Sequence, residues 1–324
     1  MARKVNNGYV LIFAAGMLWG TIGLFVKQME ECGSTPAMTS FLRVLFAALA
    51  MLPLCIVWDE WRSLLVNGKA LLYCALLGVV CHGVYNIFYS LSVTITGVSV
   101  SAVLLNIAPI ITLLFSAALF SERITKQKMI AIILNIIGCI LTVTNGCFDM
   151  TFGSGIGILF GICAGFCYAM TAIFGRFAAK QTSPVVMSFY SYSFAAMFLL
   201  FWTRPWSKNI ELGSGILLWG SMFALIPTSL AYVLYYQGLQ RIVESSRVPV
   251  IASVETVVAA LIGIVIYRER LGIFSIFGVL LVLVSIFIMN PSKKRHRCRA
   301  WRQDCCCHDY SAITLGPEKR QHGN

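Results

Sequence analysis

Long runs of apolar residues, separated by short polar or turn-forming stretches, dominate the chain from residue 8 to residue 290. About 20 consecutive apolar residues cross a hydrocarbon core of roughly 30 Å as a helix. On that rule the pattern predicts ten membrane-spanning helices. They lie near residues 8–27, 36–58, 69–91, 97–120, 128–146, 154–175, 184–203, 213–238, 247–267 and 272–290. The expected fold class is therefore an all-α membrane protein.

The second half of the chain repeats features of the first half at an offset of 147 residues, without a gap. The matched residues are Tyr85, Phe88, Tyr89, Glu122 and Arg123 in the first half, and Tyr232, Tyr235, Tyr236, Glu269 and Arg270 in the second. Each half contains five predicted helices, and an odd number of crossings inverts the second half, an arrangement typical of secondary transporters. We therefore predict a five-helix repeat over residues 1–146, a second, inverted five-helix repeat over 147–290, and a flexible basic tail over 291–324.

The composition indicates that lipid is the solvent of this chain. Hydrophobic residues make up 58% of the sequence and charged residues only 12%, too few to cover a soluble globule of 324 residues. If the N-terminus lies on the cytoplasmic side, nineteen Lys and Arg residues lie in cytoplasmic loops and the tail, and five lie in loops on the outer side of the membrane. This bias predicts a multi-pass protein of the cell membrane with both termini in the cytoplasm. It argues against nucleic-acid binding, which would need basic and aromatic residues gathered in one soluble module.

Cysteine usage predicts neither a disulfide framework nor a metal centre. Eight of the twelve cysteines lie in or beside apolar segments, where a thiol behaves as a small hydrophobic group. The tail contains metal-ligand types at His296, Cys298, Cys305–Cys307 and His308, but three adjacent cysteines do not easily converge on one tetrahedral ion. We expect no metal and no cofactor.

Four short motifs resemble those of a known family. The first helix has Leu18-Trp19-Gly20-Thr21 and then Lys27, and the second has Phe41-Leu42-Arg43 followed by small residues. The fourth has Pro109 and ends at Glu122-Arg123, and the ninth has Glu255 and ends at Glu269-Arg270. In these motifs the chain resembles the EamA-type, ten-helix branch of the drug/metabolite transporter superfamily, over roughly residues 8–290. One departure is Thr256, where such proteins often have proline.

The resemblance implies two inverted five-helix repeats, with helices one to four and six to nine around a central cavity and helices five and ten outside it. It also implies a secondary transporter of a small organic solute, such as an amino acid or other metabolite, commonly exported and commonly coupled to protons or exchange. The expected partners are a small-molecule substrate and the lipid bilayer, for a monomer or a homodimer.

The rival interpretation is an intramembrane enzyme that acts on a lipid-borne substrate. The sequence shows neither a paired-Asp signature nor a Ser/His constellation. Cys81 and His82 are adjacent on a helix and point about 100° apart, which suits a catalytic dyad poorly. We therefore expect no enzyme and no catalytic residue.

Three ionisable residues are predicted to lie in the hydrocarbon, where a charge is costly and needs a partner or a function. At 1.5 Å per residue, Glu255 lies about 12 Å beyond Arg247 and His82 about 19 Å beyond Lys69, both near the midplane. Glu255 is a candidate for proton exchange or for binding a substrate ammonium, and His82 for relaying protons; the alternative for both is a hydrogen bond between helices. Arg43, about 10 Å below the outer face, either snorkels to the interface or turns inward to a substrate carboxylate.

Aromatic and amide side chains form a second group of candidates. Tyr85 and Tyr89 are one turn apart on the third helix, and inverted symmetry sets Tyr232 and Tyr236 of the eighth helix opposite them. Aromatic rings with hydroxyl groups suit a site for a small amphiphile. The predicted cavity residues are Trp19, Tyr85, Tyr89, Asn86, Asn106, Tyr168, Tyr232 and Tyr236. The alternative is ordinary aromatic packing in the core.

Two further patterns are assigned to structure. Glycines four residues apart predict close helix crossings in the first and sixth helices. These are Gly16 and Gly20, and Gly157, Gly161 and Gly165. The duplicated Glu-Arg pairs at 122–123 and 269–270 are expected to tie each helix end to its neighbouring hairpin.

Overall fold

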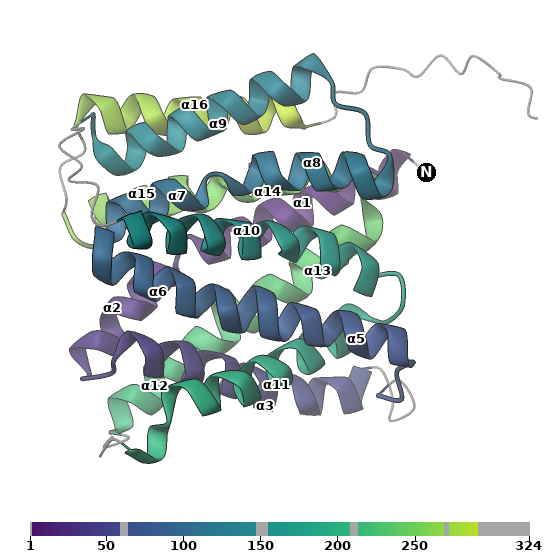
Figure 1. Ribbon diagram of the computed structural model, residues 1–324, viewed down its shortest axis with the longest axis vertical. Coiled ribbons are helices and arrows are strands. Elements are labelled where there is room, and N and C mark those ends of the chain that lie inside the picture. The colour runs from purple at the N-terminus through teal and green to yellow at the C-terminus, as the bar shows by residue number, and fades with distance from the viewer. Residues whose placement is uncertain (1, 59–63, 147–154, 208–212, 269–271, 291–324) are drawn as a thin grey trace, which may run out of the picture. The chain divides into compact units, whose positions relative to one another are not determined.

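Helices form the described part of the chain in a computed structural model, which covers residues 2–58, 64–146, 155–207, 213–268 and 272–290 (Figure 1). The first half contains α1 (Ala2–Trp19), α2 (Ile22–Glu31), α3 (Pro36–Trp58), α5 (Gly68–Leu76), η1 (Leu77–Val84), α6 (Tyr85–Thr96), α7 (Val98–Leu105), α8 (Ala108–Phe120) and α9 (Lys126–Thr144). The second half contains α10 (Gly155–Ala178), α11 (Pro184–Thr203), η2 (Pro205–Ser207), α12 (Ser214–Phe223), η3 (Ala224–Leu230), α13 (Ala231–Arg241), η4 (Ser245–Arg247), α14 (Val248–Ala252), α15 (Val254–Val265) and α16 (Ile273–Met289). The expected all-α fold class is confirmed.

Nine helical stretches in the described residues are long and apolar enough to cross a membrane. They are Gly8–Glu31, Pro36–Val57, Gly68–Thr96, Val98–Phe120, Lys126–Thr144, Gly155–Ala178, Pro184–Thr203, Ser214–Arg241 and Ser245–Val265. The tenth predicted span is the shorter apolar helix α16, whose 17 residues extend about 26 Å at 1.5 Å per residue. The ten predicted helices are thus confirmed, and the third and eighth run further than predicted, to Thr96 and Arg241.

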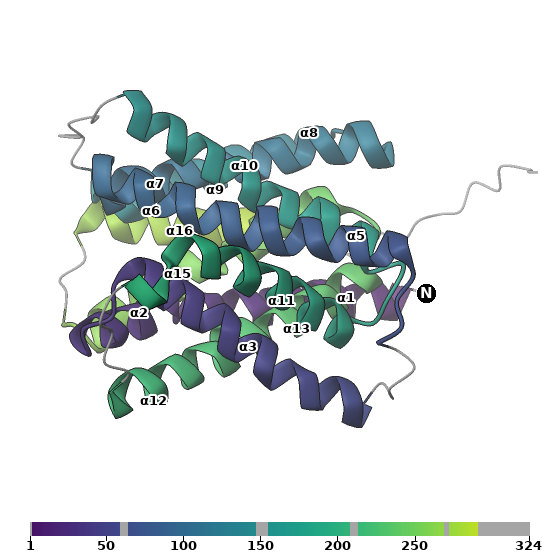
Figure 2. The same ribbon diagram turned by 60° about the horizontal axis from the view of Figure 1, so that its bottom comes forward.

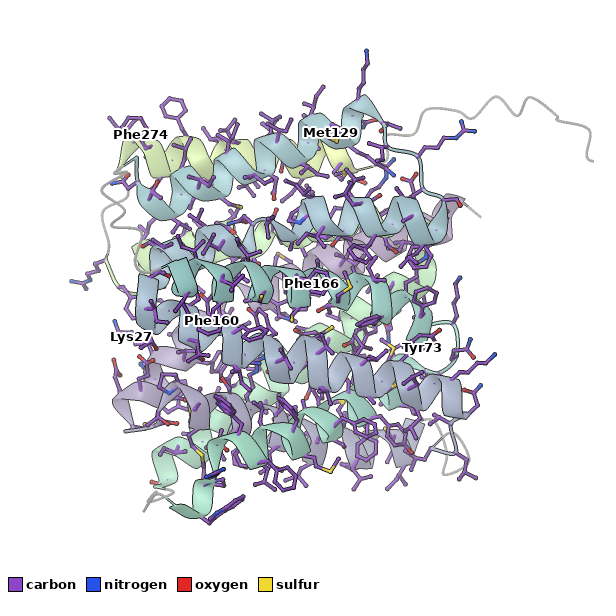
Figure 3. All side chains as sticks on the ribbon, in the orientation of Figure 1. Lys27, Tyr73, Met129, Phe160, Phe166 and Phe274 are labelled. Carbon is purple, nitrogen blue, oxygen red and sulfur yellow. The ribbon has the colours of Figure 1, made fainter. Side chains whose placement is uncertain are left out.

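The long helices run between two faces of the bundle. Helix α1 begins at one face, here called the N-terminal face, and Tyr73 lies near it (Figures 1 and 3). Lys27 lies at the opposite, distal face (Figure 3). Helices α9 and α16 pack along each other at one edge of the bundle, where Met129 and Phe274 lie. Helices five and ten therefore lie outside the central group, as the resemblance implied.

The central helices pair across the boundary between the two halves. Helix α1 packs on α13, α3 packs on α11, and α6 packs on α10 (Figures 1 and 2). Each pair takes one helix from each half of the chain. Any site between these pairs is consequently built by both halves.

Interruptions of the helices follow the sequence repeat. The π-helical segments η1 and η3 begin at Leu77 and Ala224, 147 residues apart, and Pro227 lies within the second. The breaks between α7 and α8 at Asn106, and between α14 and α15 at Ser253, have the same offset. Helix nine is thus interrupted without a proline at position 256. Irregular turns of this kind leave backbone groups available and are frequent at functional sites.

Glycines allow the close crossings that their spacing predicted. A Cβ atom built on Gly16 would lie 2.6 Å from the carbonyl oxygen of Ala252, and one on Gly20 would lie 2.8 Å from that of Glu255. On α10, a Cβ atom at Gly161 would lie 2.3 Å from the Leu104 side chain. These glycines bring α1 against the broken ninth helix and α10 against the fourth, so the packing prediction is confirmed.

Replacing Gly16 by leucine is expected to destabilise the protein, because the added side chain has no space beside Ala252. Overpacking of this kind costs about 1–3 kcal/mol in well-packed interiors. Thermal unfolding of the purified variant should therefore occur at a lower temperature than that of the wild type. The matched control is Gly23→Leu, since no atom lies within 4 Å of a Cβ atom built on Gly23. Equal losses in both variants would contradict the packing assignment.

Candidate functional site

Aromatic side chains from both halves gather between the paired helices. The Trp19 ring, at the end of α1, lies 4.9 Å from the Tyr232 ring and 5.0 Å from the Tyr235 ring of α13. Tyr85 of α6 lies 5.9 Å from Tyr89 and 6.0 Å from Tyr168 of α10. We call these rings, with Tyr192, Tyr236 and His82, the aromatic cluster. The structure brings together all the predicted aromatic residues.

His82 lies inside the aromatic cluster on the π-helical segment η1. Its ring is 4.8 Å from the Tyr232 ring and 5.4 Å from the Tyr192 ring, and only 1% of the residue is exposed. Its Nε2 atom lies 3.5 Å from the hydroxyl of Tyr236. Among the described residues, His82 and Glu255 are not hydrogen-bonded to each other, so the predicted relay between these two groups has no direct contact.

Glu255 occupies the first turn of α15, directly after the break at Ser253. The Tyr168 hydroxyl donates to its Oε1 atom at 3.5 Å. Within the described residues, no basic side chain lies within the 4.0 Å of an ion pair with Glu255. Part of its surface is accessible. The carboxyl group is therefore available to a proton or to a cationic group of a solute.

Arg43 turns toward the interior of the bundle from α3. Its guanidinium carbon lies 5.3 Å from the centre of the Phe223 ring, which is buried. Its Nε atom is buried and has no hydrogen-bond partner. No carboxylate pairs with Arg43 in the described part of the chain. A guanidinium in this setting can bind an anionic group of a solute.

The two predicted amide residues are engaged in local hydrogen bonds. Asn86 donates to the carbonyl oxygen of His82 at 2.5 Å and accepts from the Ser40 hydroxyl at 3.2 Å, so it joins η1 to α3. Asn106 donates to the carbonyl oxygen of Ala102 at 2.9 Å, at the end of α7. These bonds stabilise helix irregularities beside the aromatic cluster.

The aromatic cluster is accessible unevenly. Its buried members are Trp19, His82, Tyr192, Tyr235 and Tyr236. Its partly exposed members, together with the adjacent charged residues, are Arg43, Tyr85, Tyr89, Tyr168, Tyr232 and Glu255. Along α6 and α13, Tyr89 and Tyr232 lie nearer the distal face than His82 and Tyr236. Of these four side chains, the two nearer the distal face are the ones with accessible surface.

Three neighbours of the site were not among its predicted residues. Tyr192 is fully buried, donates to the carbonyl oxygen of Thr228 in η3 at 3.1 Å, and meets the Tyr232 ring edge-on. The repeat gave no signal for it, since the matched position is Leu45. Tyr235 stood opposite Phe88 in the repeat and could have been found from it. Phe223 has no such signal.

Glu122, at the end of α8, ties that helix to the second half of the chain. Its carboxylate accepts from the backbone N–H groups of Ser245 and Ser246 at 2.7 and 3.1 Å, and from Arg176 at 2.5 Å. The structural assignment of this residue is confirmed. The matched pair Glu269-Arg270, and the tail with its His and Cys residues, lie outside the described residues.

Glu244 lies outside the membrane spans and beside this carboxylate. Burial alone raises the pKa of Glu244, but a hydrogen bond from Arg247 and the charges of Arg247 and Lys128 outweigh that effect. The pKa of this carboxyl is therefore below its usual value. The carboxylate stays charged at neutral pH.

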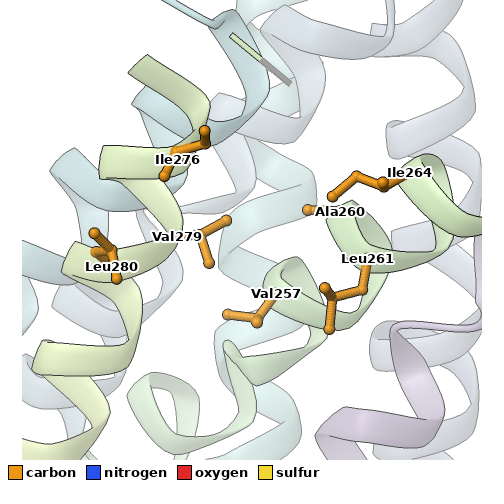
Figure 4. A pocket seen from close by; sticks show the side chains of 7 residues that line it. All are labelled: Val257, Ala260, Leu261, Ile264, Ile276, Val279 and Leu280. Carbon is orange, nitrogen blue, oxygen red and sulfur yellow. The ribbon is translucent and has the colours of Figure 1, made fainter. Parts of the chain in front are cut away.

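A groove between α15 and α16 differs in chemistry from the aromatic cluster (Figure 4). Its lining is entirely aliphatic: Val257, Ala260, Leu261, Ile264, Ile276, Val279 and Leu280. Such a groove suits lipid chains and offers no polar side chain to a solute. Across the described residues, no group of three His, Cys, Asp or Glu side chains is placed to hold a metal ion.

Comparisons with known proteins agree with this architecture. The chain matches the model of the EamA-like transporter family twice, over residues 6–144 and 155–290. It is 28% identical over 286 residues to an "Uncharacterized transporter" of Archaeoglobus fulgidus, an alignment that covers 88% of this chain and 97% of that protein. It is 26% identical over 308 residues to "Uncharacterized transporter YwfM" of Bacillus subtilis, covering 92% and 97%. A solved structure described as "Crystal structure of protein" shares the fold, with a TM-score of 0.74 at 15% identity, covering 87% of this chain and 95% of that one.

Proposed function

Because the chain belongs to the EamA-like transporter family, we propose that it is a secondary transporter that moves a small organic solute across the cell membrane by alternating access. Two family domains and relatives named as transporters make the chain a multi-pass membrane transporter and not an enzyme. The intramembrane enzyme is therefore set aside. The substrate, the coupling and the direction given below are parts of the proposal.

The observation that carries the proposal is that two charged side chains at the aromatic cluster, Arg43 and Glu255, form no ion pair within the described part of the chain. Arg43 and Glu255 each lie within electrostatic range of Tyr85 and Tyr232, which come from different halves of the chain. A solute with a carboxylate for Arg43, an amine for Glu255 and an apolar body for the rings would satisfy all three. An amino acid, or a metabolite with the same groups, fits this description. One chain supplies the whole site, so a monomer is sufficient for transport.

Export coupled to protons or exchange is the direction and driving force that we propose. Glu255 can alternate between a proton and the solute amine, because both compete for the same carboxylate. Proton entry would then favour release of the solute. The aromatic rings provide a surface that binds the solute body in both states.

Both termini are proposed to lie in the cytoplasm, which makes the N-terminal face the cytoplasmic face. The support is the excess of Lys and Arg residues in the loops of that face. A fluorescent protein fused after Asn324 should fluoresce, and alkaline phosphatase fused at the same point should be inactive. Fusions in the 204–212 loop should behave in the opposite way. An active phosphatase at the C-terminus would overturn the orientation.

The experiment that tests the function is counterflow in proteoliposomes. Purified protein is loaded with one unlabelled solute at a time, from a panel of amino acids, their amides and their decarboxylated amines, and uptake of the same labelled solute is followed. We expect saturable uptake for a related group of solutes that carry both an amine and a carboxylate. Uptake no greater than in protein-free liposomes across the panel would contradict this substrate class.

A further inference from the structure

A cluster of charges, of which Glu122 and Lys128 are buried, joins the two halves of the chain at the N-terminal face. It consists of Glu122, Lys128, Arg176, Glu244 and Arg247, here called the ion-pair cluster. Arg176 lies 2.5 Å from Glu122, and Lys128 lies 3.8 Å from Glu122 and 3.3 Å from Glu244. Arg247 pairs with Glu244 and donates to the carbonyl oxygen of Met289 at 2.6 Å. The ends of α8, α9, α10 and α16 and the segment before α14 thus meet at one place.

Most of the bonds to Glu122 cross the boundary between the halves. Its carboxylate accepts from Arg176 and from the backbone of Ser245 and Ser246, all in the second half, and from the Ser246 hydroxyl at 2.5 Å. Its side chain is only 5% exposed, and that of Lys128 is 1% exposed. If the halves separated at this face, the carboxylate of Glu122 and the guanidinium of Arg176 would lose their partners until water molecules took the place of those partners. Loss of a partner is costly for a buried charge.

The basic residues of the ion-pair cluster are not duplicated in the repeat, although the Glu-Arg motif is. At the offset of 147 residues, Arg176 corresponds to Met29, Lys128 to Ser275 and Arg247 to Val100. The repeat therefore does not duplicate the three basic residues that pair with Glu122 and Glu244. These ion pairs thus belong to the N-terminal face and are not copied by the internal symmetry.

The position of the ion-pair cluster matches the uneven access to the aromatic cluster. His82 and Tyr236, which lie nearer the N-terminal face than Tyr89 and Tyr232, are buried, whereas Tyr89 and Tyr232 are partly exposed. Tyr9, in the first crossing, is also buried and lies within electrostatic range of four charges of the ion-pair cluster. Buried side chains, those of Tyr9, His82 and Tyr236, thus lie on the side of the aromatic cluster where the ion pairs are formed.

We propose that the ion-pair cluster is the lock that holds the N-terminal face shut, and that it opens and re-forms once in each transport cycle. The inference rests on the proposed alternating access and adds the residues that bias it. Because these ion pairs are formed between the two halves at the N-terminal face, the resting protein favours the conformation closed at that face. Glu122 is the central positioning residue, since it binds both the basic side chains and the backbone of the opposing half.

The test measures distances between spin labels at both faces of the full-length protein in nanodiscs, with no solute added. One label pair occupies Arg123→Cys and Lys180→Cys, two exposed positions on either side of the ion-pair cluster. For this pair Cys32, Cys147, Cys163 and the cysteines at 298 and 305–307 are replaced by serine. The second pair, at the distal face, uses the native Cys32 with Ile266→Cys, which is 50% exposed, and the same other cysteines are replaced.

Glu122→Gln is expected to increase the fraction of molecules that are open at the N-terminal face. The label-to-label distance should then become longer at the N-terminal face and shorter at the distal face. The ratio of open to closed molecules should rise by a factor of about ten or more. Arg176→Lys, which keeps the charge but loses the branched donor, should produce a smaller shift. Glu31→Gln, an exposed glutamate at the distal face, is the matched control and should change neither distance.

Two outcomes would overturn the proposal. One is an unchanged pair of distances in a Glu122→Gln protein that elutes and melts as a folded protein. The other is broadening at both faces together, which would show a general structural role without a bias between states. Because no solute takes part, these results are independent of the counterflow experiment, and a failure of the proposed substrate class would leave them unaffected.

Discussion

Glu255→Gln is expected to abolish solute accumulation driven by a pH gradient while preserving solute exchange at equilibrium. Glutamine keeps the size of the side chain and can still accept from the Tyr168 hydroxyl, which lies 3.5 Å from the carboxylate. It cannot bind or release a proton. If Glu255 carries the coupling proton, flux under an imposed gradient should fall to the level of protein-free liposomes. Counterflow should continue with a higher half-saturating concentration, because the glutamine oxygen can still accept a hydrogen bond from the solute amine but lacks the negative charge.

The comparison is made at equal amounts of reconstituted protein, with Glu30→Gln as the control. Glu30 is an exposed glutamate near the end of α2, so its neutralisation should leave gradient-driven flux unchanged. Wild-type accumulation in the Glu255→Gln protein would rule out the proton-carrier role. Glu255 would then be a group that packs and hydrogen-bonds at the start of α15.

Arg43→Gln is expected to weaken transport of solutes that carry a carboxylate by about ten- to a hundredfold in half-saturating concentration. A hydrogen bond to a charged group contributes about 1.5–3 kcal/mol, and each 1.4 kcal/mol is a tenfold change. The change should cost little stability, because the Nε atom of Arg43 has no partner to lose and no ion pair forms in the described residues. Arg43→Lys should retain part of the affinity.

The matched solute for this experiment is the amide of the same compound. It lacks the negative charge, so its transport should be similar in the wild type and in the Arg43→Gln protein. The wild-type preference for the acid over the amide should disappear in the variant. An equal loss for acid and amide would show that Arg43 acts through packing on Phe223 and does not bind the carboxylate.

Much of the architecture followed from local pattern and internal symmetry. The apolar runs predicted the ten helices, and the offset of 147 residues brought Tyr85 and Tyr232 into one region, where both take part in the aromatic cluster. The break at Ser253 and the π-helical segments were not predicted. A π-helical turn has the same apolar composition as an α-helical one, and it is stabilised by distant contacts such as that of Tyr192 with Thr228.

The partners of Glu122 illustrate the same limit. The duplicated Glu-Arg pair indicated a structural task at two helix ends, but the basic residues that complete it lie far away in the sequence. Arg176 is 54 residues from Glu122, and Ser246 is 124 residues away. No local spacing signals these contacts. The structure was therefore needed to show that Glu122 joins the two halves of the chain at the N-terminal face.

The central claim is that this protein uses an ion gradient to move a small organic solute through the aromatic cluster. Its most direct test is accumulation of a labelled solute, chosen by counterflow, in proteoliposomes with an imposed pH gradient, before and after addition of a protonophore. We predict accumulation above the external concentration and its collapse when the gradient is dissipated. Equilibration to the external concentration alone, unaffected by the protonophore and by exchange with internal solute, would contradict the account.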